Sequence, residues 1–362
     1  RFMRTVRIHC TIGPACNDPR ILAEMIEAGM DVARVNLSHG SAESQADKLE
    51  NFRKAVKRTG VQGASIMFDT RGPEIRIKDM PGGEVNLENG DVVNIRCMDD
   101  FVDGKPTEKD IFDGYYIGNI LPINYEGLYK DVEVGSEVLI DDGKVRLIVE
   151  SIHGKEIICH VERGGVVKSH KSVNLPDVYL NMEYLNEEDK ADIIWCIENG
   201  VDYIAASFVR RKEDVAALRS FMDSNGGQKV GIIAKIESKE GVSNLEGIAS
   251  IADQMLVARG DLGVEIGFEK VPAVQKRIIR KCNELGKAVI IATQLMDSMI
   301  TSPVPTRAEV SDVANAVFDG ATDLLVTGET ASGQYPVEVI REMETIIHQA
   351  EHDLDRYGPE FL

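Results

Sequence analysis

The stretch KVGIIAKIES, residues 229–238, decides the fold of this 362-residue chain. It begins as an apolar, partly β-branched run, which is typical of a strand buried on both faces. It then ends with two opposite charges, Lys235 and Glu237. Because alternate side chains of a strand lie on the same face, we expect these two side by side where the strand ends.

Strands of this kind alternate with helices along most of the chain. After RIHCTIG, the segment DPRILAEMIEAG predicts a helix with Asp18 at its N-cap, Pro19 in its first turn and Gly29 at its end. Thr306 and Glu309 later have the spacing of a capping box. Eight such units predict a (β/α)8 barrel. The alternative is an open, doubly wound sheet, but no G-x-G-x-x-G follows the first strand and no G-x-x-x-x-G-K-[ST] occurs.

The alternation stops for about a hundred residues in the middle of the chain. From about Glu74 to Lys171, short alternating apolar segments are separated by Gly, Asp and Asn, as in EVNLENGDVVNIRC. This pattern predicts an antiparallel β-barrel domain inserted after strand three, hinged so that it closes over the barrel and excludes water. The expected regions are barrel residues 1–73 and 172–350, inserted residues 74–171, and a C-terminal stub at 351–362.

The composition excludes several classes of function. A net charge of -19 and a pI near 4.9 would repel nucleic-acid backbones and anionic lipids, so we expect neither nucleic-acid nor membrane binding. No apolar stretch reaches membrane-spanning length, and RFMRTVRIHC lacks the core of a signal peptide. The six scattered cysteines form no C-x-x-C pair. We therefore expect a cytoplasmic protein without a disulfide framework or a zinc site.

Polar side chains follow the predicted strands at the end where (β/α)8 barrels carry their chemistry. For any single pair of polar residues, a strand end exposed to solvent is an equally good explanation. Polar residues at the ends of six strands on the same rim favour a functional site. The residues are Arg34, Asn36 and Ser38 from strand two; Asp69 and Thr70 from strand three; Lys235 and Glu237 from strand five; Arg259 and Asp261 from strand six; Thr293 and Gln294 from strand seven; and Thr327 and Glu329 from strand eight.

Two of these carboxylates suit a magnesium ion. Glu237 and Asp261 come from adjacent strands, and Mg²⁺ typically takes one or two protein carboxylates together with water and substrate oxygens. Lys235 would lie beside the ion, and Arg34 opposite it would complete a cationic clamp for a phosphoryl group. The alternative is that Lys235 and Glu237 form only a salt bridge, but a buried pair of this kind gains little net stability after desolvation.

A second set of residues offers only oxygen ligands with one full charge. Asn36, Ser38, Asp69 and Thr70 make up this set, which suits a weakly held monovalent cation better than zinc or a transition metal. Capping and turn formation explain any two of the four equally well.

Longer motifs carry a resemblance over nearly the whole chain. CTIGPA, DVARVNLSHG, FDTRGPEIR, IAKIES, VARGDLGVE, ATQLMDSM, PTRAEVSDVANAV and TGETASGQYP occur in the same order as in the pyruvate kinase family, which the chain therefore resembles. The resemblance implies a barrel with a β domain inserted after strand three. It also implies phosphoryl transfer from phosphoenolpyruvate to ADP, giving pyruvate and ATP, with Mg²⁺ (or Mn²⁺) and usually K⁺, in a homo-oligomer.

The resemblance also implies a role for each matching residue. Lys235 would contact the migrating phosphoryl group, and Arg34 would contact phosphate as well. Glu237 and Asp261 would bind Mg²⁺, and the backbone of Gly260 and Asp261 would hold the substrate carboxylate. The other implied sets are the K⁺ ligands Asn36, Ser38, Asp69 and Thr70; the nucleotide contacts Asn36, His39 and Arg76; and, for protonation of the enolate, Thr293 with a water relay that includes Thr327 and Glu329. Glu74 is the family feature that accompanies potassium dependence.

The chain departs from the family pattern in two respects. Asn181 stands where most members have an aspartate, and Glu188 stands where they have a lysine near the bound nucleotide. A reversed charge near a phosphate costs about a few kcal/mol, so we expect weakened ADP binding. In addition, the chain stops at DRYGPEFL, whereas family members continue into a C-terminal domain. We therefore expect no sugar-phosphate activation and weaker assembly.

Two other functions remain open at this point. A degenerate paralogue would bind phosphoenolpyruvate as a sensor or scaffold without turnover, and Asn181 and Glu188 favour it. A magnesium-dependent enolate lyase or aldolase would use Glu237 and Asp261, but it leaves Lys235 unexplained.

Overall fold

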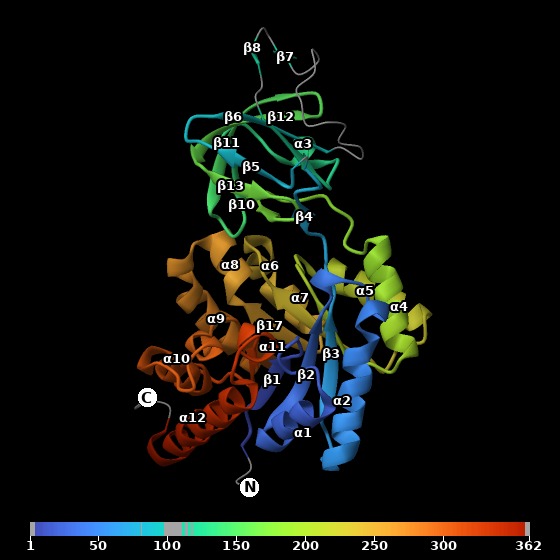
Figure 1. Cartoon of the computed structure of the whole chain (residues 1–362), viewed down its shortest axis with the longest axis vertical. Helices are drawn as coiled ribbons and strands as arrows, with labels where there is room; N and C mark the ends of the chain where they lie inside the picture. The colour runs from blue at the N-terminus through green and yellow to red at the C-terminus, as the bar shows by residue number, and fades with distance from the viewer. Residues whose placement is uncertain (1–3, 81, 98–110, 113–114, 117–118, 359–362) are drawn as a thin grey trace.

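The computed structural model describes residues 4–358 apart from residues 81, 98–110, 113–114 and 117–118 (Figure 1). Eight parallel strands close into a barrel in the order β1-β19-β18-β17-β16-β15-β3-β2. The predicted (β/α)8 barrel is confirmed. Its strands are β1 (Arg7–Thr11), β2 (Met30–Asn36), β3 (Ser65–Asp69), β15 (Tyr203–Ala206), β16 (Gly231–Ile236), β17 (Gln254–Ala258), β18 (Ala288–Ala292) and β19 (Asp323–Val326).

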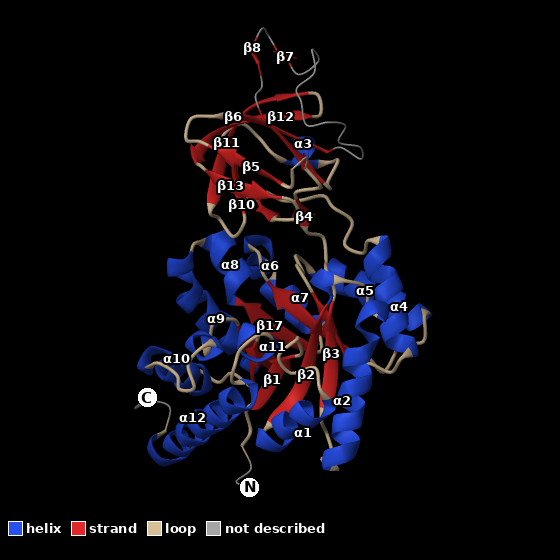
Figure 2. Cartoon of the chain, in the orientation of Figure 1, coloured by secondary structure: helices blue, strands red, loops and turns tan. Residues whose placement is uncertain are grey.

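Helices surround this barrel on its outer side, as Figure 2 shows. They are α1 (Pro19–Ala28), α2 (Ala46–Thr59), α4 (Glu187–Glu198), α5 (Lys212–Ser224), α6 (Lys239–Ser243), α7 (Leu245–Ile251), α8 (Arg259–Ile266), α9 (Val271–Glu284), α10 (Arg307–Phe318), α11 (Gly328–Ala331) and α12 (Pro336–Tyr357). Among the described residues, no helix is both long and apolar enough to cross a membrane.

The capping signals in the sequence set the helix ends. The Asp18 side chain accepts a hydrogen bond from the backbone N–H of Arg20, and Gly29 ends α1 with φ of 133°. At α10, Thr306 and Glu309 form the predicted capping box, in which each side chain bonds to the other's backbone N–H. These local bonds satisfy backbone groups that a helix end otherwise leaves unpaired.

The alternation along β16 explains why its sequence is apolar on both faces. Ile232, Ala234 and Ile236 belong to the large core between the barrel and its helices. Ile233 belongs to the separate cluster inside the barrel. Lys235 shares the phase of Ile233, so the strand directs the lysine into the barrel at its carboxyl end.

The insertion forms a sheet with its own core above the carboxyl end of the barrel (Figure 1). Its strands run in the order β4-β14-β10-β11-β12-β6-β9, and a bridge between Ile77 and Ile123 nearly closes them into a second barrel. β6 and β9 pair in parallel, so this barrel is mixed, where the sequence predicted an antiparallel one. The strands are β4 (Ile75–Arg76), β6 (Val92–Cys97), β9 (Asn119–Ile123), β10 (Glu137–Ile140), β11 (Val145–His153), β12 (Glu156–Arg163) and β14 (Ser172–Asn174).

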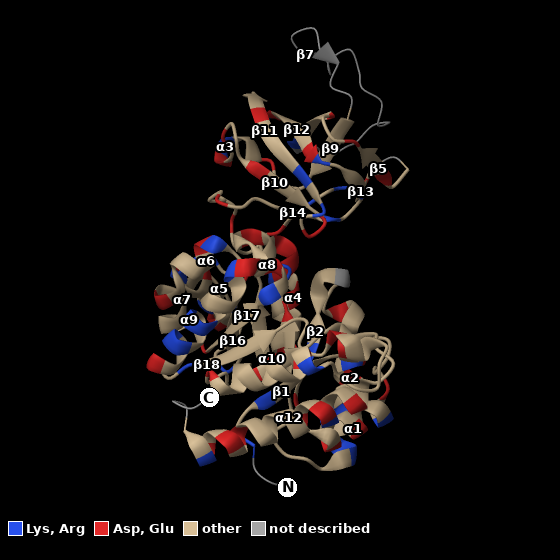
Figure 3. Ribbon diagram, turned by 90° about the vertical axis from the view of Figure 1, so that its left-hand side faces the viewer, with Lys and Arg blue, Asp and Glu red and all other residues tan. Residues whose placement is uncertain are grey.

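Smaller elements complete the insertion. β5 (Glu84–Leu87) pairs with β13 (Gly165–Lys168), β7 (Ile111–Phe112) pairs with β8 (Tyr115–Tyr116), and α3 (Leu128–Asp131) is a single short helix. Figure 3 shows Asp and Glu residues gathered around α8, where the barrel faces the inserted sheet.

Candidate active site at the carboxyl end of the barrel

The centre of the site is Asp69, at the end of β3. Arg34 grips both of its carboxylate oxygens, with Nε 3.0 Å from Oδ1 and Nη2 2.7 Å from Oδ2. Lys235 Nζ lies 3.0 Å from Asp69 Oδ2, and Arg34 Nη1 donates to Thr11 Oγ1 at 3.1 Å. Burial alone would raise the pKa of Asp69, but the two cations outweigh it and hold the pKa below its ordinary value.

Lys235 and Glu237 lie side by side, as the sequence predicted, with Nζ and Oε1 3.1 Å apart. Lys235 also donates to Ser207 Oγ at 2.9 Å, and the backbone N–H of Phe208 donates to Glu237 Oε2 at 2.6 Å. Burial raises the pKa of Glu237; the charge of Lys235 opposes this shift and the like charge of Asp261 adds to it. Burial lowers the pKa of Lys235, but its acidic neighbours more than reverse that effect.

Asp261 reaches this cluster from a helix rather than from a strand. β17 ends at Ala258, so Arg259 and Asp261 lie in the first turn of α8, which corrects their predicted place on strand six. The carboxyl group of Asp261 lies close enough to that of Glu237 for their charges to interact, and burial raises its pKa. Arg259 instead pairs with Asp312 at 2.8 Å and stays outside the cluster.

The cluster contains more acidic than basic side chains. Its carboxylates are Asp69, Glu237 and Asp261, and its cations are Arg34 and Lys235. No group of three or more His, Cys, Asp or Glu side chains placed to hold a metal ion occurs within the described part of the chain. The two facing carboxylates, Glu237 and Asp261, match the number that Mg²⁺ usually takes from a protein.

Thr293 and the pair Thr327 and Glu329 directly follow the last two strands, and Glu329 lies in α11. Thr293 follows β18 with φ of 75°, and its Oγ1 accepts the backbone N–H of Gly260 at 3.0 Å. Glu329 is buried and accepts the backbone N–H of Thr327 at 2.7 Å and that of Met296 at 3.2 Å. These residues follow the strands rather than ending them, because β18 stops at Ala292 and β19 at Val326.

The predicted monovalent-cation residues lie at the ends of two neighbouring strands. Asn36 and Asp69 are register partners across β2 and β3. Asn36 Oδ1 accepts the Ser38 N–H at 3.0 Å, so the capping interpretation applies to Asn36. The backbone carbonyl of Thr70 accepts the Ser207 hydroxyl at 2.7 Å. Carbonyl and carboxylate oxygens have more than one lone pair, so these bonds do not preclude a weakly bound cation.

Of the residues expected near the nucleotide, Asn36 ends β2 in the barrel and Arg76 lies in the insertion. Arg76, on β4, pairs with Glu74 through Nη2 at 2.8 Å. The His39 side chain lies outside the described residues. Asn181 Nδ2 donates to Asp131 Oδ1 at 2.7 Å, and the exposed Glu188 lies 3.6 Å from Arg71 Nε.

Sequence reasoning missed the contributions of strands one and four. Thr11, at the end of β1, holds Arg34, while Ser207 and Phe208, directly after β15, hold Lys235 and Glu237. The polar Ser207 interrupting the apolar segment YIAASFV was the available signal.

The chain is similar to known proteins over most of its length. The sequence profile of the pyruvate kinase barrel domain matches residues 3–340. A pyruvate kinase of Clostridium perfringens is 42% identical over 353 residues, covering 98% of this chain and 72% of that protein. Another, of Geobacillus stearothermophilus, is 46% identical over 354 residues, covering 97% of this chain but only 58% of that protein. The chain therefore belongs to the pyruvate kinase family.

Proposed function

We propose that this chain is the catalytic core of a cytoplasmic pyruvate kinase, active as a homo-oligomer. It transfers the phosphoryl group of phosphoenolpyruvate to ADP with Mg²⁺ and K⁺. The bond from phosphorus to the enol oxygen breaks, and a bond to the terminal β-phosphate oxygen of ADP forms. The remaining enolate takes a proton at its methylene carbon and becomes pyruvate. The arrangement of Arg34, Asp69, Lys235 and Glu237 around one point of the barrel mouth carries this proposal.

The donor set fits a hard divalent cation. Glu237 and Asp261 face each other with raised pKa values, because burial disfavours their charged forms. A divalent ion between them would balance the excess of carboxylates in the cluster. Bound there, Mg²⁺ or Mn²⁺ would neutralise negative charge on the phosphoryl group.

Lys235 and Arg34 supply positive charge that is already in place before the substrate arrives. Asp69 holds both cations, and Ser207 holds the lysine from a second direction. Phosphoryl transfer depends chiefly on positioning and charge stabilisation, and groups that need not reorganise are the most effective. We assign Lys235 to the migrating phosphoryl group and Arg34 to a phosphate oxygen.

The start of α8 would bind the substrate carboxylate through the backbone N–H groups of Gly260 and Asp261, with Gly260 giving up its hydrogen bond to Thr293 Oγ1, aided by the positive end of the helix dipole. Because Thr293 Oγ1 lies 3.0 Å from Gly260 N, its hydroxyl would lie beside the bound substrate. We assign Thr293 to protonation of the enolate, with protons relayed by water, Thr327 and Glu329.

Two assignments concern potassium and ADP. Asn36, Ser38, Asp69 and Thr70 would bind K⁺, and Glu74 accompanies that dependence. Asn36, His39 and Arg76 would contact the nucleotide. The inserted residues 74–171 would act as a lid that excludes water from the phosphoryl group.

A coupled assay of pyruvate formation tests the proposal. We expect turnover with phosphoenolpyruvate, ADP and Mg²⁺, stimulated by K⁺, and a loss of at least about a thousandfold in kcat for Lys235→Met. Lys54→Met is the control, because Lys54 is an exposed residue of α2 paired with Glu50. Full turnover by Lys235→Met would overturn the proposal. Calorimetric binding of phosphoenolpyruvate without turnover by the unmodified chain would instead identify a sensor or scaffold.

A further inference from the structure

One loop contacts both Lys235 and Glu237. This β15 loop, residues 207–211, connects β15 to α5. Its Ser207 Oγ accepts from Lys235 Nζ at 2.9 Å, and its Phe208 N–H donates to Glu237 Oε2 at 2.6 Å. The loop therefore sets the positions of the proposed phosphoryl-binding lysine and one proposed magnesium ligand.

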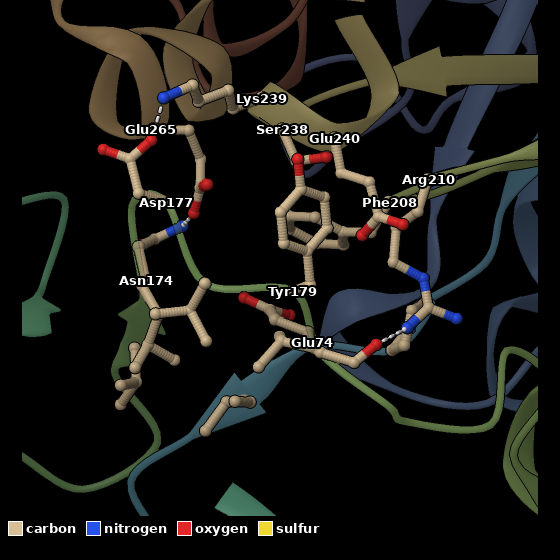
Figure 4. Close-up of a pocket in the computed structure, with 16 residues that line it drawn as sticks. Glu74, Asn174, Asp177, Tyr179, Phe208, Arg210, Ser238, Lys239, Glu240 and Glu265 are labelled. Carbon is tan, nitrogen blue, oxygen red and sulfur yellow. Dashed lines mark hydrogen bonds and ion pairs between the residues drawn. The ribbon is translucent and has the colours of Figure 1, made fainter. Parts of the chain in front are cut away.

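The same loop is tied to the chain that leaves the inserted domain. This return segment, residues 175–186, lies between β14 and α4. Arg210 Nη1 donates to the carbonyl of Leu180 and Nη2 to that of Met182, each at 2.9 Å. Tyr184 Oη donates to the carbonyl of Ser207, also at 2.9 Å. Figure 4 shows Arg210 and Phe208 beside a pocket that Tyr179 of the return segment also lines.

Hydrogen bonds fix the orientation of the buried Arg210 side chain. It is 5% exposed, and Asp214 Oδ2 accepts from its Nε at 3.1 Å while Oδ1 accepts from its Nη2 at 3.2 Å. Asn244 also donates to its carbonyl at 3.0 Å. A planar guanidinium group serves a carboxylate and two carbonyls at once, whereas an ammonium group offers no such fork.

The chain that enters the insertion contacts the loop as well. Gly72 has φ of 72°, and a Cβ atom there would lie 2.5 Å from the carbonyl oxygen of Ser207. Within the loop, Phe208 has φ of 52°, an unfavourable conformation for a residue other than glycine. Such a conformation persists only where its surroundings enforce it, and both crossings of the insertion contribute to those surroundings.

We propose that Arg210 is a positioning residue for phosphoryl transfer. By clamping the return segment to the β15 loop, it makes the position of Lys235 and Glu237 depend on how the inserted domain is seated on the barrel. This inference rests on the proposed function. It predicts that loosening the clamp displaces the lysine and the metal carboxylate without removing either.

Arg210→Lys tests this proposal, since it keeps the charge opposite Asp214 and loses the contacts to both carbonyls. We expect kcat to fall about tenfold and the Mg²⁺ concentration for half-maximal activity to rise about fivefold, as for residues that orient metal ligands. Arg4→Lys is the matched control. Arg4 is similarly buried and bonds to Asp31 and to the carbonyl of Val6, away from the site. It should retain wild-type kcat and Mg²⁺ dependence.

A second variant covers the case in which Arg210→Lys does not fold. Tyr184→Phe removes the other tie between the return segment and the β15 loop, and it should change kcat and Mg²⁺ dependence in the same direction by a smaller factor. The double variant should be non-additive, because both ties act on one loop. Equal kcat and Mg²⁺ dependence in wild type, Tyr184→Phe and any folded Arg210→Lys would overturn the proposal.

Direct Mn²⁺ binding, followed by electron paramagnetic resonance, separates this inference from the proposed function. If the unmodified chain binds Mn²⁺ but makes no pyruvate, the proposed function fails. The clamp is then still supported by weaker Mn²⁺ binding in Arg210→Lys or Tyr184→Phe than in Arg4→Lys, and it is overturned by equal binding.

Discussion

The two ends of the barrel each contain a buried charge cluster, but they balance their charges differently. At the amino end, Asp323 lies 2.7 Å from Arg7 Nε and 2.8 Å from His9 Nε2, and Thr322 donates to its other oxygen at 2.6 Å. Burial alone would raise the pKa of Asp323, yet these partners lower it. At the carboxyl end, the cations likewise lower the pKa of Asp69, but burial prevails at Glu237 and raises its pKa.

The opposite directions of the Asp323 and Glu237 pKa shifts distinguish a buried carboxylate whose charge is balanced by its neighbours from one whose charge is not. A carboxylate whose pKa is lowered is stabilised by partners that the protein itself provides. A buried carboxylate whose pKa is raised lacks enough positive charge, and a bound ligand can supply it. In barrels of this type chemistry lies at the carboxyl end, so the difference agrees with the architecture.

Removing charge from the carboxyl-end cluster should have the largest effect. Glu237→Gln relieves the excess of carboxylates, so we expect the free energy of unfolding in urea to stay the same or rise. The same change removes a proposed metal ligand, and kcat/KM should fall by at least about a thousandfold. A marked loss of stability would contradict the comparison, because it would show that Glu237 is stabilised by its neighbours in the way Asp323 is.

Removing charge from the amino-end cluster should have the reverse pattern. Asp323→Asn leaves Arg7 and His9 without their ionised partner, and we expect it to lower the free energy of unfolding by about 2–3 kcal/mol. kcat should stay within about twofold of wild type, because the cluster lies at the other end of the barrel. Urea denaturation and the pyruvate assay on one preparation would measure both.

Acid provides an independent check on Asp323. Its pKa in the folded protein is below the ordinary value of 3.8, so the unfolded chain takes up this proton first as the pH falls. The stability that Asp323 contributes is therefore present above pH 3.8 and lost below it. Asp323→Asn should reduce the fall in stability through this range, and an unchanged acid profile would argue against the pair.

How much of this was predictable from sequence differs between the two ends. The Lys-x-Glu spacing at 235 and 237 follows from strand periodicity alone, and that contact was predicted correctly. The ion pairs of Arg34 and Lys235 with Asp69 depend on how β2, β3 and β16 are aligned, which no local sequence pattern encodes. The Arg7 and Asp323 pair requires the first and last strands to meet when the barrel closes. The early end of β17 was missed because its apolar run leads directly into the first turn of α8.

Glu265 on α8 is an intermediate case that sharpens the comparison. Asn174 Nδ2 donates a hydrogen bond to it at 3.1 Å, and burial raises its pKa to about 7. Between its ordinary pKa of 4.5 and about 7, the folded protein binds more protons than the unfolded chain. Stability should therefore rise as the pH falls through this window, by up to about 3 kcal/mol.

Urea denaturation near pH 8 and near pH 5 would test this effect, with Glu265→Gln expected to remove that part of the pH dependence. The sign is opposite to that for Asp323, so one pair of variants tests both directions. The opposite result is a wild-type free energy of unfolding that falls between pH 8 and pH 5, with the same pH dependence in Glu265→Gln. It would show that hydrogen bonds stabilise the ionised Glu265 as well as a neighbouring cation would.

The smallest effect is expected where a carboxylate is exposed. Glu50 lies 2.6 Å from Lys54 on α2, a shorter separation than that between Lys235 and Glu237, but both side chains are mostly in solvent. Water screens the pair, so Glu50→Gln should change the free energy of unfolding by less than about 0.5 kcal/mol and leave kcat unaltered. A larger change would mean that the distance between the charges determines how much these ion pairs contribute to the free energy of unfolding. A change within that limit, beside a large effect for Asp323→Asn, would show that burial and charge balance govern it.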